Sequence, residues 1–348
     1  MPGRFQFAFA CHTEMKQPEA LDRYREDIVR ELAYSMSRYG LPMYDMLRYQ
    51  LGWSGECVPA EYSGGKLVRP TLLLLACESV GGDWRQALPA AVAVELVHNF
   101  TLIHDDIEDD DEERRKRATV WRLWGKPQAI NAGDAMHSMA RLALLRLSET
   151  GVLPEKCLLA AEILDNTCLV LCEGQYLDIS YEDRLDISVE DYLEMADRKT
   201  ASLFAASLQM GALIGCDDDH TINQFQRFGQ KMGQAYQMMD DVLGIWGEET
   251  ASDLRKRKKT FPVIYTLEHA TASEREELTG IYGKDELDPD DIGRVTAILD
   301  RMDANRYTRA LAGKYYDLAL AEIQGLDLMP SANGLFNDII TYLEIGAN

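Results

Sequence analysis

Helical periodicity is the feature of this sequence that most restricts its fold. Long stretches repeat their apolar residues every three to four positions, the spacing that places them on one face of an α-helix. Alternating runs that would indicate strands are nearly absent, and only 11 prolines interrupt the 348 residues. Segments with helical spacing cover 21–39, 84–107, 128–148, 157–179, 190–214, 221–246 and much of 263–348. We predict an all-α fold of ten or more helices.

The segment 84–107 differs from the others because it is apolar on nearly every side. A helix of this kind is typically buried all round, so we place it at the centre of the fold. No Pro-rich or Ser/Gly-rich linker divides the chain, and it contains no fixed-period repeat. We therefore interpret residues 1–348 as a single large helical domain, although the length would allow two domains.

The charge balance and the cysteines limit the surroundings of the protein. With 58 acidic against 36 basic residues the net charge is −22, and such a chain repels nucleic acid and anionic membrane surfaces. Seven cysteines without a C-x-x-C pair favour reduced thiols over a disulfide or zinc framework. We recognise no secretory leader and no apolar run close to the ~18 residues of a membrane span. We expect a soluble, cytoplasmic protein that does not bind nucleic acid and does not span a membrane.

An acidic cluster follows the apolar segment. On a helix, Asp105 and Asp109 lie one turn apart on the same face, with Asp106 beside them. Like charges this close repel one another, and burial at the end of an apolar helix increases the cost. Cations between the carboxylates would remove this cost, and ligands that are all oxygen favour Mg²⁺. The alternative is a solvated acidic helix end that leads into a loop.

A second acidic pair, Asp240 and Asp241, lies on the periodic segment 221–246. It shares a small, polar helix face with Gln237 and Gly244. Two helices that each carry aspartates on an inward face could hold several metal ions between them. Because Mg²⁺ is usually bound by a few carboxylates together with substrate phosphates, the implied ligand is a diphosphate or polyphosphate.

Basic residues follow both aspartate pairs. They occupy 114–117 and 255–259, and Lys66 and Arg69 lie one turn apart after a glycine pair. Arginine binds phosphate oxygens in pairs, and lysine binds them as a point charge. The runs therefore fit a phosphate ligand, although each run taken alone is more typical of a solvated face that balances nearby acids.

Together these motifs resemble the trans-isoprenyl diphosphate synthase (polyprenyl synthetase) family, from about residue 60 to 270, and within it the short-chain geranylgeranyl and farnesyl diphosphate synthases. Seven family motifs occur in the family's order within 64–262. They are G-G-K-x-x-R-P at 64–70, D-D-x-x-D at 105–109, the pair Arg114 and Arg115, G-Q-x-x-D at 174–178, K-T at 199–200, the second aspartate motif at 236–241 and K-x-T-x-P at 258–262. The resemblance implies a helical bundle of the isoprenoid synthase type with a central substrate cavity.

The reaction that the resemblance implies is that of a Mg²⁺-dependent trans-prenyltransferase. Such an enzyme ionises an allylic diphosphate and joins it head-to-tail to isopentenyl diphosphate, which releases pyrophosphate. The product would be a short-chain all-trans prenyl diphosphate, C20 or C15. The family also implies three Mg²⁺ ions per active site and a homodimer.

The matched motifs carry family roles onto particular residues. The resemblance implies that Mg²⁺ is bound directly by Asp105, Asp109 and Asp240, with Asp106 and Asp241 in or near the coordination shell. The groups that would neutralise or orient the allylic diphosphate are Arg114, Lys199, Lys258, Thr200 and Gln237. Those that would hold isopentenyl diphosphate are Lys66, Arg69, His98 and Arg115. A hydrogen-bonded core histidine is the alternative interpretation of His98.

The residues before the first aspartate motif bear on product length. In this family, bulky residues four or five positions before that motif close the floor of the tunnel in which the chain grows. Phe100 and Thr101 occupy these positions, and one aromatic beside one small residue indicates an intermediate floor. We therefore predict C20 ahead of C15. Ordinary core packing is the alternative for Phe100.

Departures from the family pattern keep other functions open. Gly244 stands where the second aspartate motif normally ends in aspartate, and the stretch 247–253 lacks the usual Gly-Lys. These losses are the feature that would favour the alternative of a non-catalytic subunit of a heteromeric prenyltransferase, although both aspartate pairs remain. A class I terpene cyclase is a further alternative, although a cyclase would not need Lys66, Arg69 and His98. An acidic helical scaffold without activity would not explain the ordered motifs.

Overall fold

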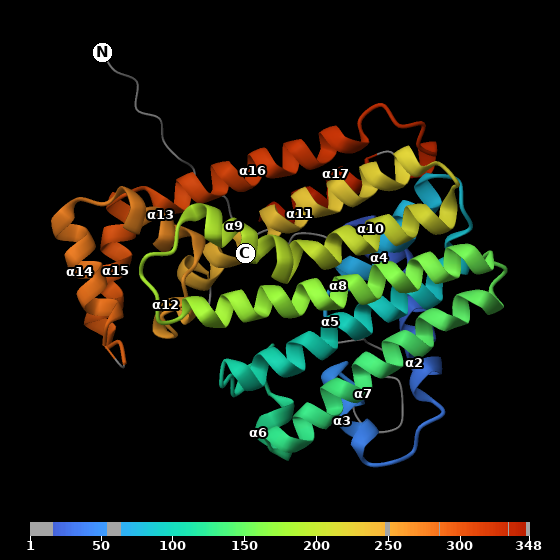
Figure 1. The fold of residues 1–348 in the computed structure, drawn as a ribbon, viewed down its shortest axis with the longest axis horizontal. Helices are drawn as coiled ribbons and strands as arrows, with labels where there is room; N and C mark the ends of the chain where they lie inside the picture. The colour runs from blue at the N-terminus through green and yellow to red at the C-terminus, as the bar shows by residue number, and fades with distance from the viewer. Residues whose placement is uncertain (1–16, 54–63, 248–250, 285, 333, 346–348) are drawn as a thin grey trace.

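The computed structural model describes residues 17–53, 64–247, 251–284, 286–332 and 334–345. Helices form nearly all of the regular structure (Figure 1), so the prediction of an all-α fold is confirmed. The α-helices are α1 (Glu19–Arg23), α2 (Arg25–Met36), α3 (Met43–Gln50), α4 (Val68–Ser79), α5 (Leu88–Glu108), α6 (Val120–Trp124), α7 (Lys126–Leu145), α8 (Pro154–Tyr181), α9 (Val189–Ala196), α10 (Ser202–Gly215), α11 (Asp219–Trp246), α12 (Ser252–Arg255), α13 (Phe261–His269), α14 (Ala272–Tyr282), α15 (Pro289–Arg301), α16 (Ala304–Ile323) and α17 (Leu335–Ile345).

The helix α5 lies inside the bundle, as its all-round apolar composition predicts. It packs against α2, α4, α7 and α10, and every residue from Pro89 to Val97 is buried. The helix α10 packs between α4 and α11, and α16 covers α11. The C-terminal ends of α5 and α11 lie at the same end of the bundle (Figure 1). This arrangement brings the two aspartate pairs toward each other.

By length and composition alone, the segment Trp84–Glu108 could cross a membrane, because its most apolar window has a mean hydropathy of 1.3. The segment lacks the uninterrupted apolar run of ~18 residues that predicts a span, so it was not predicted to be one. In the structure 67% of the window is buried inside the bundle, as expected of a core helix. The absence of a membrane span stays a prediction.

A smaller apolar core lies beside the main one. It contains Ile245 at the end of α11, Leu254 of α12 and buried residues of α13, α14 and α15. Because Leu254 is fully buried there, the basic run that follows it is held close to the end of α11. The interpretation of the whole chain as one domain stays a prediction.

Two local features depart from the helical pattern. The segment 190–214 is divided by a π-helical turn over Asp197–Ala201. The charged stretch after the first aspartate cluster forms an antiparallel hairpin of β1 (Glu113–Arg114) and β2 (Arg117–Ala118). Strands of two residues are too short to show the alternation by which strands are recognised in a sequence, so the hairpin was not predicted.

Candidate active site

A cavity of about 870 Å³ lies where α5 and α11 end, a volume typical of small-molecule sites. Its walls come from α5, α8, the π-helical turn, α11 and the segment 252–260. The predicted site residues that line it are Arg69, His98, Phe100, Thr101, Asp105, Arg114, Arg115, Lys199, Thr200, Gln237, Asp240, Asp241 and Lys258. Asp106, Asp109 and Lys66 lie next to this lining without forming part of it.

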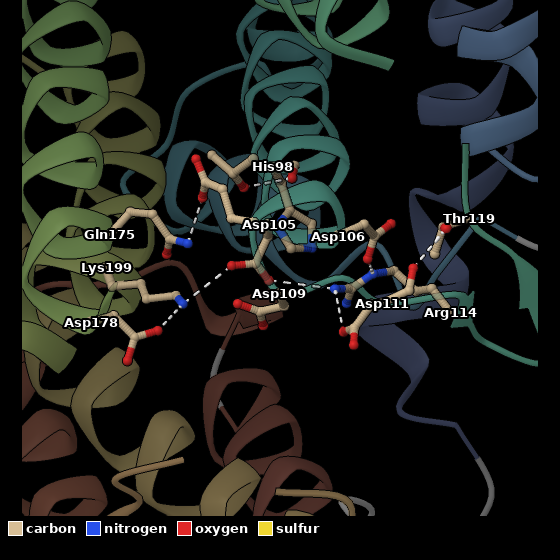
Figure 2. Close-up of polar contacts among 12 residues, drawn as sticks. His98, Asp105, Asp106, Asp109, Asp111, Arg114, Thr119, Gln175, Asp178 and Lys199 are labelled. Carbon is tan, nitrogen blue, oxygen red and sulfur yellow. Dashed lines mark hydrogen bonds and ion pairs between the residues drawn. The ribbon is translucent and has the colours of Figure 1, made fainter. Parts of the chain in front are cut away.

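Asp105 lies in the last turn of α5 and faces bases from two other elements. Its carboxylate is 3.2 Å from the Lys199 ammonium and 3.4 Å from the Arg114 guanidinium (Figure 2). Burial raises the pKa of this carboxyl, but Lys199, Lys258 and Arg114 outweigh burial and lower the pKa to about 2. Asp105 is therefore ionised at neutral pH.

The neighbouring residue, Asp106, points away from Asp105 toward the hairpin. Its side chain is only 1% exposed and accepts a 2.6 Å hydrogen bond from Arg114 Nε. Burial raises the pKa of Asp106 to about 6, against the lowering effect of Arg114. The predicted role of Asp106 in or near a metal shell is untested, and its visible contact is with the arginine that it holds in place.

Lysines from the segment after α12 reach the other acids of the first cluster. Asp109 caps the end of α5, and its Oδ2 accepts a 2.7 Å hydrogen bond from Lys258. Lys256 forms an ion pair with Asp111. The carboxylates of the first motif and the bases that follow the second motif are thus joined across the cavity.

The two aspartates of the second motif have opposite environments. Asp240 opens into the cavity, and no described residue forms an ion pair or hydrogen bond with its carboxylate. The side chain of Asp241 accepts hydrogen bonds from Tyr192 Oη (2.6 Å), Phe261 N (2.7 Å) and Gln237 Nε2 (2.9 Å). Burial raises the pKa of Asp241 to about 7. These contacts tie α11 to α9 and α13, so Asp240 is the better placed of the two to bind a cation.

The π-helical turn presents Lys199 and Thr200 to the cavity. A Cβ atom on Gly174 of α8 would lie 2.2 Å from the backbone nitrogen of Lys199, so only glycine allows α8 to approach the turn this closely. Lys199 forms an ion pair with Asp178, and the Thr200 hydroxyl donates to Gln237 Oε1. The turn therefore places a cation and a hydroxyl beside the two aspartate motifs.

A second basic region lies deeper along α4 and α5. The Arg69 guanidinium carbon is 4.5 Å from the centroid of the Phe204 ring, and its Nη1 is 3.4 Å from His98 Nε2. Arg69 Nε is buried without a hydrogen-bond partner among the described residues. Burial and the charge of Arg69 lower the pKa of His98 well below its ordinary value, so the imidazole is neutral. This region can accept an anion without a metal ion.

Two further predicted residues border this basic region. A Cβ atom on Gly65 would lie 3.0 Å from the Arg115 guanidinium nitrogens, which places Arg115 directly over the glycine turn. The Lys66 ammonium lies 5.1 Å from the centroid of the Tyr342 ring of α17. Arg115 thus joins Arg69 and His98 in the cavity wall, whereas Lys66 lies toward the C-terminal helix.

The half-buried Phe100 ring forms part of the cavity wall next to α7. It meets the His104 ring edge-on at 5.4 Å and lies 5.0 Å from the His137 ring, measured between centroids. Thr101 donates a 2.8 Å hydrogen bond to the His98 carbonyl. Both interpretations of Phe100 stay open, because the ring lines the cavity and also packs against neighbours.

Some residues of the site were not assigned a role from the sequence. Asp178 lies in the quoted G-Q-x-x-D motif, which could have indicated its ion pair with Lys199. Tyr192 and Asp253 carry no such signal, because helical spacing does not reveal which side chains of distant segments meet. Both line the cavity.

The donor atoms of the site fit hard cations. Among the described residues, no group of three His, Cys, Asp or Glu side chains is placed to hold a metal ion on its own. Oxygen donors are nevertheless available, since Asp106 Oδ2 is buried without a hydrogen-bond partner in the described part of the chain, and Asp240 opens into the cavity. Because Mg²⁺ often takes only one or two carboxylates together with phosphate oxygens, these residues fit Mg²⁺ that binds with a diphosphate.

An all-α bundle in which two aspartate motifs and several bases meet over one cavity defines the class of isoprenoid synthases. Residues 56–299 match the polyprenyl synthetase family, and the chain belongs to this family. It is 37% identical over 297 residues to the (2E,6E)-farnesyl diphosphate synthase of Mycobacterium tuberculosis, covering 82% of this chain and 80% of that one. It is 38% identical over 287 residues to the geranylgeranyl diphosphate synthase of Saccharolobus solfataricus, covering 81% of this chain and 85% of that one. The crystal structure of polyprenyl synthetase from Streptomyces coelicolor A3(2) superposes with a TM-score of 0.84 at 35% identity, covering 93% of this chain and 98% of that one.

Proposed function

We propose that the protein condenses isopentenyl diphosphate with an allylic diphosphate to give a short-chain all-trans prenyl diphosphate of 20 or 15 carbons. The observation that carries this proposal is the presence of two different anion-binding regions along one cavity. One contains both aspartate motifs with Lys199 and Lys258, and the other contains Arg69, His98 and Arg115. A reaction between two diphosphates needs two such regions. The relatives named farnesyl and geranylgeranyl diphosphate synthase support the two product lengths.

The aspartate region would hold the allylic diphosphate. The family uses Mg²⁺, and Asp105, Asp109 and Asp240 would hold it, with three ions per site by family resemblance. Bound Mg²⁺ would supply positive charge that stabilises pyrophosphate as it leaves. Lys199 and Lys258, which are paired with aspartates in the structure, would bind the phosphate oxygens.

The residues around these groups would position them. Asp106 holds the Arg114 guanidinium, which also lies next to Asp105. Asp241 is engaged by three donors and fixes α11 against its neighbours. The hydrogen-bonded pair of Thr200 and Gln237 would orient the departing group. We therefore propose Asp106 and Asp241 as positioning residues.

Isopentenyl diphosphate would bind in the second basic region without a metal ion. Arg69 is fixed by aromatic contact and keeps one buried donor without a partner among the described residues. His98 is neutral and can share a hydrogen bond without adding charge, and Arg115 supplies a second guanidinium. A terpene cyclase uses one diphosphate only, so this region favours the synthase over the cyclase.

The proposal is tested by incubating the protein with Mg²⁺, labelled isopentenyl diphosphate and each of the C5, C10 and C15 allylic diphosphates. We expect a linear C20 or C15 diphosphate, read by mass spectrometry. A cyclised hydrocarbon formed without isopentenyl diphosphate would establish the cyclase instead. No product from any primer would favour the non-catalytic subunit.

Phe100 provides a test of product length. If its ring closes the growth tunnel, Phe100→Ala should give longer products at a retained rate. If it only packs the core, the variant should lose about 3–5 kcal/mol of stability and keep its product spectrum. Chain lengths and the melting temperature, measured on the same preparation, distinguish the two. Unchanged products from a stable, active variant would remove Phe100 from the tunnel floor.

We also propose a homodimer that forms through the outer face of α7 and α8. These helices follow one another in the chain and contact each other near their connection (Figure 1). Large apolar side chains on their surfaces are exposed to solvent. They are Ile130, Leu142 and Leu145 on α7 and Leu158, Leu159 and Leu169 on α8. An apolar surface of this kind is typical of a protein interface, and a second copy of the same face would cover it.

The dimer surface is tested by the double variant Leu158→Glu/Leu169→Glu. Leu158 is 72% and Leu169 is 65% exposed, so glutamate is tolerated in the isolated chain but repels a second copy. We expect the mass from light scattering to fall from that of a dimer to that of a monomer. Leu318→Glu, on the 53% exposed Leu318 of α16, is the matched control. A double variant that stays dimeric would exclude this face.

A cytoplasmic location is also a proposal. The described cysteines are free thiols, namely Cys77, Cys157, Cys168, Cys172 and Cys216. Burial raises the pKa of the Cys77 and Cys168 thiols to about 12, so they stay protonated and unreactive. Unpaired thiols are typical of proteins in a reducing compartment.

A further inference from the structure

The position of Gly244 is occupied in space by another acidic residue. Gly244 lies in the last turn of α11, three residues after Asp241, where the family's second motif normally ends in aspartate. A Cβ atom on Gly244 would lie 1.8 Å from Asp253 Oδ2 and 2.4 Å from its Cγ. The Asp253 carboxylate therefore fills the space that a side chain at position 244 would take.

The local backbone fixes Asp253 in this position. The chain turns back at Ala251, whose φ of 62° is in the left-handed region and whose N–H donates to the Ile245 carbonyl at 3.2 Å. The Ser252 hydroxyl donates to the Gly244 carbonyl at 3.3 Å. Leu254 anchors α12 in the smaller core. Asp253 is held between these contacts, so its approach to Gly244 follows from the fold of the turn.

The Asp253 carboxylate faces the cavity and both aspartate motifs. It lines the cavity together with Asp240 and Lys258, and its charge interacts with those of Asp240, Asp109 and Lys258. No hydrogen bond or ion pair to this carboxylate is formed by any other described residue. Most other carboxylates of the site, Asp105, Asp106, Asp109, Asp178 and Asp241, are each paired with a base or a donor. Asp253 and Asp240 thus keep both carboxylate oxygens free of hydrogen-bond and ion-pair partners among the described residues, and both line the cavity.

We propose that Asp253 takes the place of the missing last aspartate of the second motif and that its carboxylate helps to bind the cations beside Asp240. The carboxylate reaches the site from α12, after the turn, and Gly244 is the residue that leaves room for it. This inference rests on the proposed function, because it assumes that the aspartate region holds Mg²⁺ with a diphosphate. It also implies that the departure at Gly244 does not leave the second motif incomplete.

The test measures cation binding apart from catalysis. Binding of inorganic pyrophosphate is followed by calorimetry as the Mg²⁺ concentration is raised, for the wild type, Asp253→Asn and the control Asp317→Asn, which changes an exposed aspartate on α16. We expect pyrophosphate binding to Asp253→Asn to require at least about tenfold more Mg²⁺ than binding to the wild type. This is the usual cost of losing a carboxylate that supports a metal site. Asp317→Asn should match the wild type. Binding of isopentenyl diphosphate without Mg²⁺ should be equal in all three and shows that the fold is retained.

Returning the carboxylate to α11 gives a second test. The double variant Gly244→Asp/Asp253→Ala carries the acid where the family pattern has it, and we expect its Mg²⁺ requirement to return to within about threefold of the wild type. Asp253→Ala alone should keep the tenfold loss. An unchanged Mg²⁺ requirement in Asp253→Asn, or a double variant as defective as Asp253→Ala, would overturn the role of Asp253. A wild type that neither binds pyrophosphate with Mg²⁺ nor forms a prenyl product would overturn the proposed function itself.

Discussion

Alanine in place of Asp105 or Asp240 is expected to lower kcat by several orders of magnitude, about 10³-fold or more. Both carboxylates line the cavity, and they come from two different helices, α5 and α11. We expect that neither can be replaced by the other, because they reach the cavity from different helices. The measurement is single-turnover product formation at saturating substrate and Mg²⁺. Near-normal turnover in either variant would contradict the metal assignment.

The same two variants should differ in stability. Asp105 is paired with Lys199 and Arg114, so its removal leaves two partly buried bases without this acid, and the melting temperature should fall. Asp240 has no ion-pair partner among the described residues, so its removal should leave the melting temperature unchanged or raise it. If repulsion between the aspartates were the only effect, the melting temperature should rise in both variants. Equal shifts in the two variants would show that the ion pairs of Asp105 do not stabilise the fold.

The second large effect is expected at Arg69. Arg69→Ala should raise the KM for isopentenyl diphosphate about tenfold or more, the equivalent of roughly 1.5–3 kcal/mol for a hydrogen bond to a charged group. The KM for the allylic substrate should change less, because Lys199 and Lys258 lie in the other region of the cavity. Steady-state kinetics with each substrate varied in turn give this comparison.

A control is needed because Arg69 also packs against Phe204. Loss of that packing could lower stability without any role in binding, so the melting temperature is measured in parallel. Arg69→Lys keeps the charge but loses the planar guanidinium, and we expect it to recover only part of the affinity. Equal damage to both substrates, or no damage, would contradict the assignment.

The sequence predicted those parts of the site that depend on one helix. The spacing of Asp105 and Asp109 placed both at the end of α5, and their neighbours in the structure agree with this. Adjacent residues on a helix point about 100° apart, so the spacing did not show that Asp240 faces the cavity while Asp241 is held by Tyr192. That distinction depends on which helices pack against α11.

Other parts of the site depend on contacts between distant segments. Asp253 reaches Gly244 only because the chain turns back after α11, and no periodic pattern encodes such a return. The hairpin that places Arg114 against Asp106 is too short to be recognised. Lys66 belongs to a family motif, yet its ammonium lies over Tyr342. The motif predicted the type of residue, and tertiary packing determined its surroundings.

The ion pairs across the cavity have a consequence for the order in which ligands bind. Lys199 and Lys258 act as internal counter-ions for Asp105 and Asp109. A cation that arrived alone at Asp109 would displace Lys258 from its ion-pair partner, and one that arrived alone at Asp105 would leave Lys199 with Asp178 only. A cation that arrived together with a diphosphate would offer each lysine a new anionic partner. Each ligand therefore raises the affinity for the other, and by thermodynamic linkage the effect is reciprocal. When metal and substrate bind, the lysines of such a site exchange their aspartate partners for phosphate oxygens. The site therefore favours joint binding of metal and substrate over binding of the metal alone.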